Sequence, residues 1–340
     1  MSTPTTVTEL FEAYIAAKSC VVRGNTLSQN RMGIRWFLRA NGNIPFREAT
    51  RSHAQAMRRL LVGNYPNKTT VTDYMKGAAT IFRWACFDQD WMDRDIFCRL
   101  HLTKQPHKPL RIYTDSEIQA MCDVADTAWQ VKILLGYYCG LRLSEVLNLR
   151  RCDIDLSQGI VSIRSHPDEK NGWPWKVKTW RSDRRVSFNG KLARVIKGRL
   201  AALPQAQPYL TLMPREYKKV MVLKHEGRLT EERCLHPITT TARIMAQLQE
   251  KAGIPHGTFH NLRHSFGTNC LLGGMQIDVV AKLMGNTRQV VANYYVEINE
   301  GRAMKQLRDL QAKPTFGVAE FESTALRPPA VRSTKLSYTP

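Results

Sequence analysis

The chain has 340 residues, 43% of them apolar, so it is long enough for two packed domains and too apolar for a disordered chain. Its 50 lysines and arginines outnumber its 29 aspartates and glutamates, which gives a formal net charge of +21. This excess favours a polyanionic partner, with nucleic acid ahead of an anionic membrane surface, over a merely solvated basic surface.

The N-terminal third shows the apolar spacing of helices. Val7, Leu10 and Tyr14 recur every three or four residues and predict one helix face. Three further helices are predicted, over about 26–41, 50–62 and 69–85. The sequence therefore predicts an all-helical domain at the start of the chain.

A break in this pattern predicts a domain boundary. Residues 103–110 read TKQPHKPL, with two prolines, two lysines and no apolar periodicity, which is typical of an extended basic linker. A capping box at Thr114–Glu117 then begins the next helix. We therefore predict a domain at 1–104, a linker at 105–112, a second domain at 113–312 and a flexible tail at 313–340.

The second domain mixes helices with a few short strands. Val, Ile and Trp enrichment predicts strands at 159–163, 175–180 and 184–188. The predicted helices cover 115–125, 128–149, 238–252, 259–272 and 277–284. The expected fold class is mostly α, with a small antiparallel β-sheet in the second domain.

The cysteine pattern and hydropathy indicate where the protein works. None of the eight cysteines pairs as CxxC, and no histidine lies at zinc-finger spacing, so we expect reduced thiols and no metal site. No signal peptide and no membrane-length apolar run is recognised. The expected location is the cytoplasm.

Two short segments place cations beside polar partners. Arg142 and Glu145 lie three residues apart on a predicted helix, where the carboxylate orients the guanidinium for a phosphate. His260 and Arg263 have the same spacing and suit a phosphodiester reaction, with His264 as a supporting residue. Taken alone, the first pattern is more often a surface ion pair, and the alternative for the second is a helix with ordinary polar residues.

The order of four motifs resembles the tyrosine recombinase family, to which the phage integrases belong. The first arginine box reads CGLRLSEVLNLRRCDID at 139–155, and the second reads HNLRHSFGT at 260–268. The tyrosine box reads KLMGNTRQVVANYYVE at 282–297, and the hairpin with the family's lysine reads KTWRSDRRVSF at 178–188. The N-terminal part resembles the family's helical core-binding domain more loosely.

The resemblance implies a role for each matching residue. Tyr295 attacks phosphorus and forms a 3′-phosphotyrosyl bond, while Arg142 and Arg263 hold the scissile phosphate. Lys178 protonates the leaving 5′ oxygen, and His260 assists proton transfer. No cofactor is implied, because the covalent link conserves the energy of the phosphodiester without ATP or a metal.

Several positions depart from the family pattern or leave a choice open. Asn286 stands where the family usually has His or Trp, and it can donate a hydrogen bond but cannot shuttle a proton. Asn261 replaces an Asp. Lys176 competes with Lys178, and Tyr294 with Tyr295, although the family spacing of nine residues after position 286 favours Tyr295.

The resemblance implies a site-specific DNA recombinase, or integrase, of a phage or another mobile element. Its expected partners are double-stranded recombination sites, a homotetramer on DNA and accessory proteins that bend the DNA. A helix at 300–311 is expected to dock on a neighbouring protomer or on its own domain. The alternatives are a relaxing enzyme like the type IB topoisomerases and a non-catalytic DNA-binding regulator with the same fold.

Overall fold

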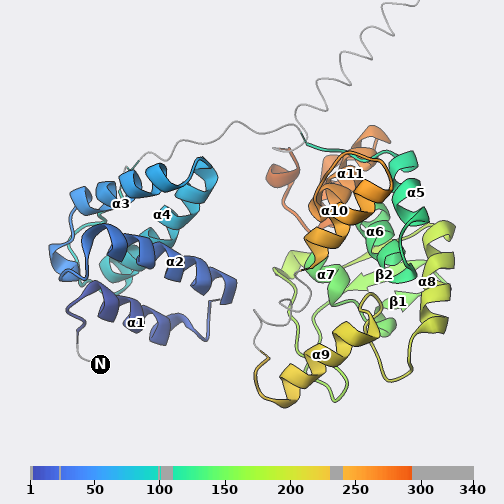
Figure 1. Cartoon of the computed structure of the whole chain (residues 1–340), viewed down its shortest axis with the longest axis horizontal. Coiled ribbons are helices and arrows are strands. Elements are labelled where there is room, and N and C mark those ends of the chain that lie inside the picture. The colour runs from blue at the N-terminus through green and yellow to red at the C-terminus, as the bar shows by residue number, and fades with distance from the viewer. Residues whose placement is uncertain (1–2, 23, 99, 101–109, 230–239, 293–340) are drawn as a thin grey trace, which may run out of the picture. The chain divides into compact units, whose positions relative to one another are not determined.

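The computed structural model describes residues 3–22, 24–98, 100, 110–229 and 240–292 (Figure 1). Most of the predicted linker, Tyr294, Tyr295, the predicted C-terminal helix and the predicted tail lie outside the described residues.

The N-terminal segment is helical, as predicted. It contains α1 (Val7–Lys18), α2 (Gly24–Asn41), α3 (Arg51–Asn64) and α4 (Lys68–Arg83), with a 3-10 turn at Phe46–Glu48 and a π-helical turn at Trp84–Asp88. The four helices enclose one apolar core, in which Phe37, Phe46 and Phe82 are fully buried. This core explains the three- and four-residue apolar spacing of the sequence.

Distances between Cα atoms divide the chain into two compact units. One unit comprises the described residues within 1–109, 166–175 and 203–247, and the other those within 110–165, 176–202 and 248–340. The five described residues that the sequence placed in catalysis all lie in the second unit: Arg142, Lys178, His260, Arg263 and Asn286.

A small antiparallel sheet is part of the second unit. Its strands β1 (Ile154–Asp155), β2 (Ile160–Ile163) and β3 (Arg184–Ser187) pair in the order β1-β2-β3. In the register, Val161 lies opposite Val186, and both side chains are buried. The expected fold class, mostly α with a small antiparallel sheet, is confirmed.

The remaining helices follow the chain. They are α5 (Asp115–Asp123), α6 (Thr127–Cys139), α7 (Leu143–Leu147), α8 (Gly190–Ala202), α9 (Pro214–His225), α10 (Thr241–Lys251), α11 (Phe259–Leu272) and α12 (Ile277–Met284). The helix α6 is apolar on nearly all sides and is buried accordingly. It packs against α11, which carries the second arginine box.

The structure corrects three expectations. The predicted helix over 128–149 is broken, because α6 ends at Cys139 and Gly140 takes the left-handed conformation with φ of 64°. The segment 175–180 is not a strand: Trp175 forms one isolated bridge with His166, and a 3-10 turn begins at Trp180. The helices α8 and α9 had no counterpart in the prediction.

No described helix is both long enough and apolar enough to span a bilayer. Within the described ranges, no three His, Cys, Asp or Glu residues come together in a group that would hold a metal ion.

Candidate active site

The first arginine of the predicted site lies at the start of a helix and not within one. Arg142 is the N-cap residue of α7, in the extended conformation. The carboxylate of Glu145 turns back and accepts hydrogen bonds from the Arg142 backbone N–H and from its Nη1 atom, both at 2.8 Å. The predicted pairing of Arg142 with Glu145 is therefore present, and the Arg142 side chain remains 19% exposed.

A second arginine, to which the sequence assigned no role, shares this carboxylate. Arg184 donates from Nη2 to Glu145 at 2.8 Å and from Nη1 at 3.1 Å, and both side chains are buried. Burial by itself raises the pKa of Glu145, but the hydrogen bonds and charge of Arg184 and the charges of Arg142 and Arg263 outweigh it. The pKa therefore lies below its usual value, and Glu145 is ionised at neutral pH.

The end of α12 brings three guanidinium groups together. Arg184 donates from Nε to the Leu283 carbonyl at 2.6 Å, and Arg263 donates to the next carbonyl, that of Met284. Arg142 then donates from Nη2 to the Gly285 carbonyl at 3.0 Å. The last carbonyls of a helix lack partners within it and carry the negative end of its dipole, so α12 suits these cations.

Asn286 completes this turn. Its Oδ1 atom accepts a hydrogen bond of 2.7 Å from Nη2 of Arg142. With Oδ1 engaged as an acceptor, the amide nitrogen retains its two donors for another group. The structure thus places the unusual Asn286 directly beside Arg142.

Two glycines at helix ends make this arrangement possible. Gly140 ends α6 and Gly285 ends α12, both with φ between 60° and 64°. A Cβ atom on Gly140 would lie 2.4 Å from a ring carbon of Phe266. The carbonyl of Gly140 accepts a hydrogen bond of 2.6 Å from Nη1 of Arg263.

Arg263 itself is only 1% exposed. Its guanidinium is fixed between the ends of α6 and α12, through the carbonyls of Gly140 and Met284. A charge buried in this way is weakly screened by solvent and acts on its neighbours at short range. Arg263 therefore strengthens the positive field of the site and fixes the turn that carries Asn286.

Two histidines lie one helical turn apart on α11. Their rings meet edge to face with centroids 4.6 Å apart, His264 being buried and His260 reaching the surface. Desolvation of the ring, followed by the charges of Arg263, Arg142 and Lys178, lowers the pKa of His260. Burial, with smaller effects of the His260 and Arg263 charges, lowers the pKa of His264 to about 4. Both imidazoles are neutral at pH 7.

Lys178 lies in an exposed loop that follows the His166–Trp175 bridge. Lys178 lies close enough to His260 for its charge to contribute to lowering the pKa of that histidine. The competing Lys176 is not among the causes of this shift. The next turn supplies the buried Ser182, whose Oγ lies 3.4 Å from Nη1 of Arg142. Lys178, His260 and Arg142 thus belong to one neighbourhood.

A hollow of about 710 Å³ opens beside Arg184 and Asn286. Its walls come from the turn at Trp180–Ser182, from β3 and from α12 with the residues that follow it. Arg184, Lys282 and Arg288 line it together with Asn286 and two aspartates, Asp183 and Asp278. The charges of this lining favour an anionic occupant.

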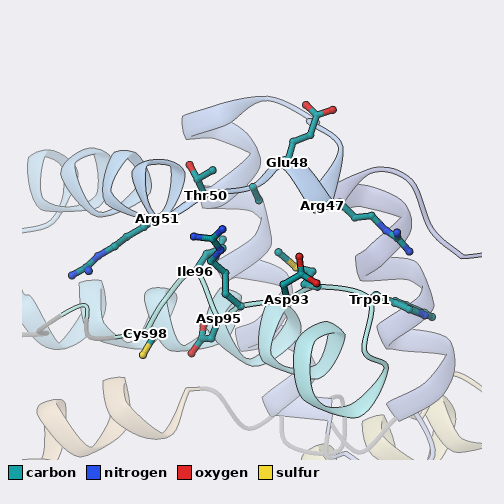
Figure 2. Close-up of a pocket in the computed structure, with 12 residues that line it drawn as sticks. Arg47, Glu48, Thr50, Arg51, Trp91, Asp93, Asp95, Ile96 and Cys98 are labelled. Atoms are coloured by element: carbon teal, nitrogen blue, oxygen red, sulfur yellow. The ribbon is translucent and has the colours of Figure 1, made fainter.

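A second hollow, of about 640 Å³, lies on the N-terminal helical segment (Figure 2). Three arginines and three carboxylates line it, so its charges balance, and one of the carboxylates, Asp95, is held by Arg83 at 2.8 Å. Figure 2 shows Arg47 and Arg51 extending to opposite sides and not toward a common point. This hollow lacks the convergent charge of the site around Arg142.

Sequence reasoning missed Arg184 and Ser182. Both stand inside the quoted hairpin motif, where two adjacent arginines follow a serine and an aspartate. The available signal was the two-residue alternation of a strand, which puts Arg184 on the same side as Val186, because an arginine at such an inward position needs a buried partner. Here that partner is Glu145.

Comparison with known proteins agrees with this geometry. The sequence matches the family described as "Phage integrase family" over residues 111–302. The tyrosine recombinase XerA of Thermococcus kodakarensis is 24% identical over 316 residues, covering 92% of this chain and 96% of that protein. A tyrosine recombinase of Thermosipho africanus is also 24% identical over 316 residues, and the match covers 89% of this chain and 99% of that protein.

Solved structures share the fold. The Tn1549 transposon integrase in complex with a circular intermediate DNA superposes with a TM-score of 0.66 at 17% identity, covering 86% of this chain and 95% of that chain. A lambda integrase tetramer bound to a Holliday junction gives 0.60 at 13% identity, with coverages of 84% and 78%. The fold and the clustered arginines define a tyrosine recombinase. The matched segment is more than half of the sequence, and the chain belongs to the phage integrase family.

Proposed function

We propose that this tyrosine recombinase cuts and rejoins duplex DNA at specific sites, through a 3′-phosphotyrosyl bond to Tyr295. The observation that carries the proposal is the convergence of Arg142, Arg184 and Arg263 on the end of α12, next to a neutral His260. Arg142 and Arg184 both pair with the same carboxylate, that of Glu145, so two guanidinium charges face one negative charge. The cluster therefore keeps a net positive charge for a phosphate.

The proposed reaction is a transesterification at phosphorus. The hydroxyl of Tyr295 attacks, its oxygen forms the new P–O bond, and the bond from phosphorus to the 5′ oxygen breaks. The proton of the tyrosine passes to the neutral imidazole of His260, and Lys178 donates a proton to the departing 5′ oxygen. Rejoining reverses these transfers, so one phosphodiester is exchanged for another without ATP.

The remaining residues of the cluster position these groups. Arg142 presents its accessible edge to the non-bridging oxygens, and Asn286 adds an amide donor next to it. Glu145 fixes Arg142 and Arg184, and His264 supports the ring of His260. Arg263 contributes its charge from within the protein.

The partners proposed for the chain follow the same reasoning. Four copies on two double-stranded sites would exchange strands through a junction, with accessory proteins bending the DNA, and the setting would be the bacterial nucleoid. The lambda integrase in its solved form is a tetramer on a Holliday junction, which supports the assembly proposed here. Phage or transposon DNA is the proposed substrate.

A cleavage assay on duplex DNA from the ends of the element tests the proposal. Wild-type protein in EDTA and without ATP should form a covalent adduct, and Arg142→Lys should lose about 100-fold or more in rate, because lysine cannot make the bidentate contact. The control Arg164→Lys, an arginine 49% exposed and paired with Asp153, should stay within about threefold. Relaxation of plasmids of any sequence, without site preference, would favour a topoisomerase instead. Site binding without any adduct would favour a non-catalytic regulator.

A further inference from the structure

The helix α9 (Pro214–His225, yellow in Figure 1) has two contrasting faces. Arg215, Lys218 and Lys219 are exposed and recur with the spacing of one helix face. Val222 continues this face one turn further on and is 48% exposed. Val220, on the opposite face, is fully buried.

The opposite face fastens α9 to two other segments of its unit. The Tyr217 hydroxyl donates to the carbonyl of Asn171 at 2.9 Å. Behind it, the rings of Trp173 and Tyr209 stack with centroids 3.8 Å apart and an interplanar angle of 11°. The ammonium of Lys224 donates to Asp168 at 2.6 Å. The helix is therefore held in one orientation, and its three exposed cations stay on one side.

These three cations have no acidic partner within the described part of the chain. The acidic residue of α9 and the one that directly follows the helix are engaged elsewhere: Glu216 caps the first turn through the Met213 N–H, and Glu226 pairs with Arg228 at 2.8 Å. A row of uncompensated cations repels itself unless a polyanion neutralises it. The exposed face of α9 is thus complementary to a regularly spaced row of anions.

We propose that the exposed face of α9 is a second DNA-binding surface, contacting backbone phosphates of the duplex through Arg215, Lys218 and Lys219. The inference rests on the proposed function, because it takes duplex DNA as the partner. An anionic membrane suits this helix poorly. Its apolar side is buried in the protein, and Val222 is the exposed face's single large apolar side chain among residues 214–225.

The proposal makes a quantitative prediction for the salt dependence of binding. Each phosphate neutralised contributes about 0.9 to the slope of log K against log salt concentration. Removing two such contacts should lower the slope by about 1.8. The loss of affinity between 50 and 200 mM salt should then be roughly tenfold smaller than for the wild type.

A matched pair of double variants tests this expectation. Arg215→Gln with Lys218→Gln removes an arginine and a lysine three residues apart on α9. Arg194→Gln with Lys197→Gln removes the same two residue types at the same spacing from the exposed side of α8. Binding of the full chain to a 30-bp duplex would be measured by fluorescence anisotropy at several salt concentrations, alongside covalent cleavage at saturating protein.

The expected result is a smaller slope and weaker binding for the α9 pair, equally on specific and unrelated DNA, with cleavage at saturation unchanged. The α8 pair should retain at least most of the wild-type slope. An unchanged slope for the α9 pair, or equal losses for both pairs, would overturn the proposal. Wild-type protein that binds DNA with the expected slope but forms no covalent adduct would instead count against the proposed function and leave α9 as a DNA-binding surface.

Discussion

The carboxylate of Glu145 offers the sharpest test of how the active site is built. Its side chain is 3% exposed and accepts from the Arg142 backbone, from the Arg142 guanidinium and twice from Arg184, at 2.8–3.1 Å. Glu145→Gln keeps the volume but removes the charge and turns an amide N–H₂ toward a guanidinium. Arg184, buried to the same degree, would lose its ionic partner.

The magnitude follows from burial. Removing one partner of a buried ion pair costs about 3–5 kcal/mol, and the retained amide oxygen recovers part of this, so we expect a loss near 3 kcal/mol. Glu117 provides a matched control, because it also caps its own helix and pairs with an arginine, Arg111, at 2.5 Å. Its side chain is 18% exposed, and Glu117→Gln should cost about 1 kcal/mol or less.

Urea unfolding of both variants measures this difference. The pKa of Glu145 lies below its usual value of 4.5, so its stabilisation is fully present above that pH and is lost as the pH falls through the lower, folded value. The gap between wild type and Glu145→Gln should therefore be constant from neutral pH down to about 5 and shrink below 4.5. Equal losses for Glu145→Gln and Glu117→Gln at neutral pH would refute the reasoning.

Three further predictions test separate features of the site. Gly140→Ala should destabilise the protein by about 2–4 kcal/mol, because the left-handed backbone and the contact with Phe266 both oppose a Cβ atom. Gly253→Ala is the control, because Gly253 has a φ of 65° with open space around it, and this change should cost about 1 kcal/mol. Equal losses of stability for the two variants in thermal unfolding would show that the contact with Phe266 contributes nothing. The rate of cleavage should fall as the pH drops through a value below 6.5, because His260 then gains a proton and can no longer accept one. His260→Gln should slow cleavage by about 100-fold and abolish this fall in rate at acidic pH. Asn286→His should preserve or raise the rate of adduct formation, whereas Asn286→Asp should lower that rate by adding negative charge. If Asn286→His loses cleavage while DNA binding persists, the site is built differently.

The sequence predicted the pairing of side chains in the site better than it predicted the course of the backbone there. Spacing placed Glu145 beside Arg142, and the structure joins them at 2.8 Å. The apolar pattern continues past Gly140 to Leu149, so it favoured one long helix over the local stop signal of Gly140, whose left-handed conformation breaks the helix. That break is what carries Arg142 out of the helix and turns the carbonyl of Gly140 toward Arg263.

Contacts between distant segments were beyond the reach of the sequence pattern. The hydrogen bonds of Arg184 to Glu145 and to Leu283 span 39 and 99 residues, and no local rule relates those positions. The segment 175–180 resembled a strand by composition, but the chain turns at Trp180 and pairs only once, at Trp175. By contrast, α11 and α12 were predicted at the bounds observed, because their apolar periodicity and the glycines after them are local signals.

The central claim, covalent strand transfer through Tyr295, is tested most directly by trapping the adduct. A nicked suicide duplex carrying the end of the element would be incubated, without metal, with wild type, Tyr295→Phe and Tyr294→Phe, and each reaction analysed on a denaturing gel. The account predicts a protein–DNA adduct with wild type and Tyr294→Phe and none with Tyr295→Phe. Loss only in Tyr294→Phe would move the nucleophile by one residue, and no adduct from wild type on a duplex that it binds would contradict the claim.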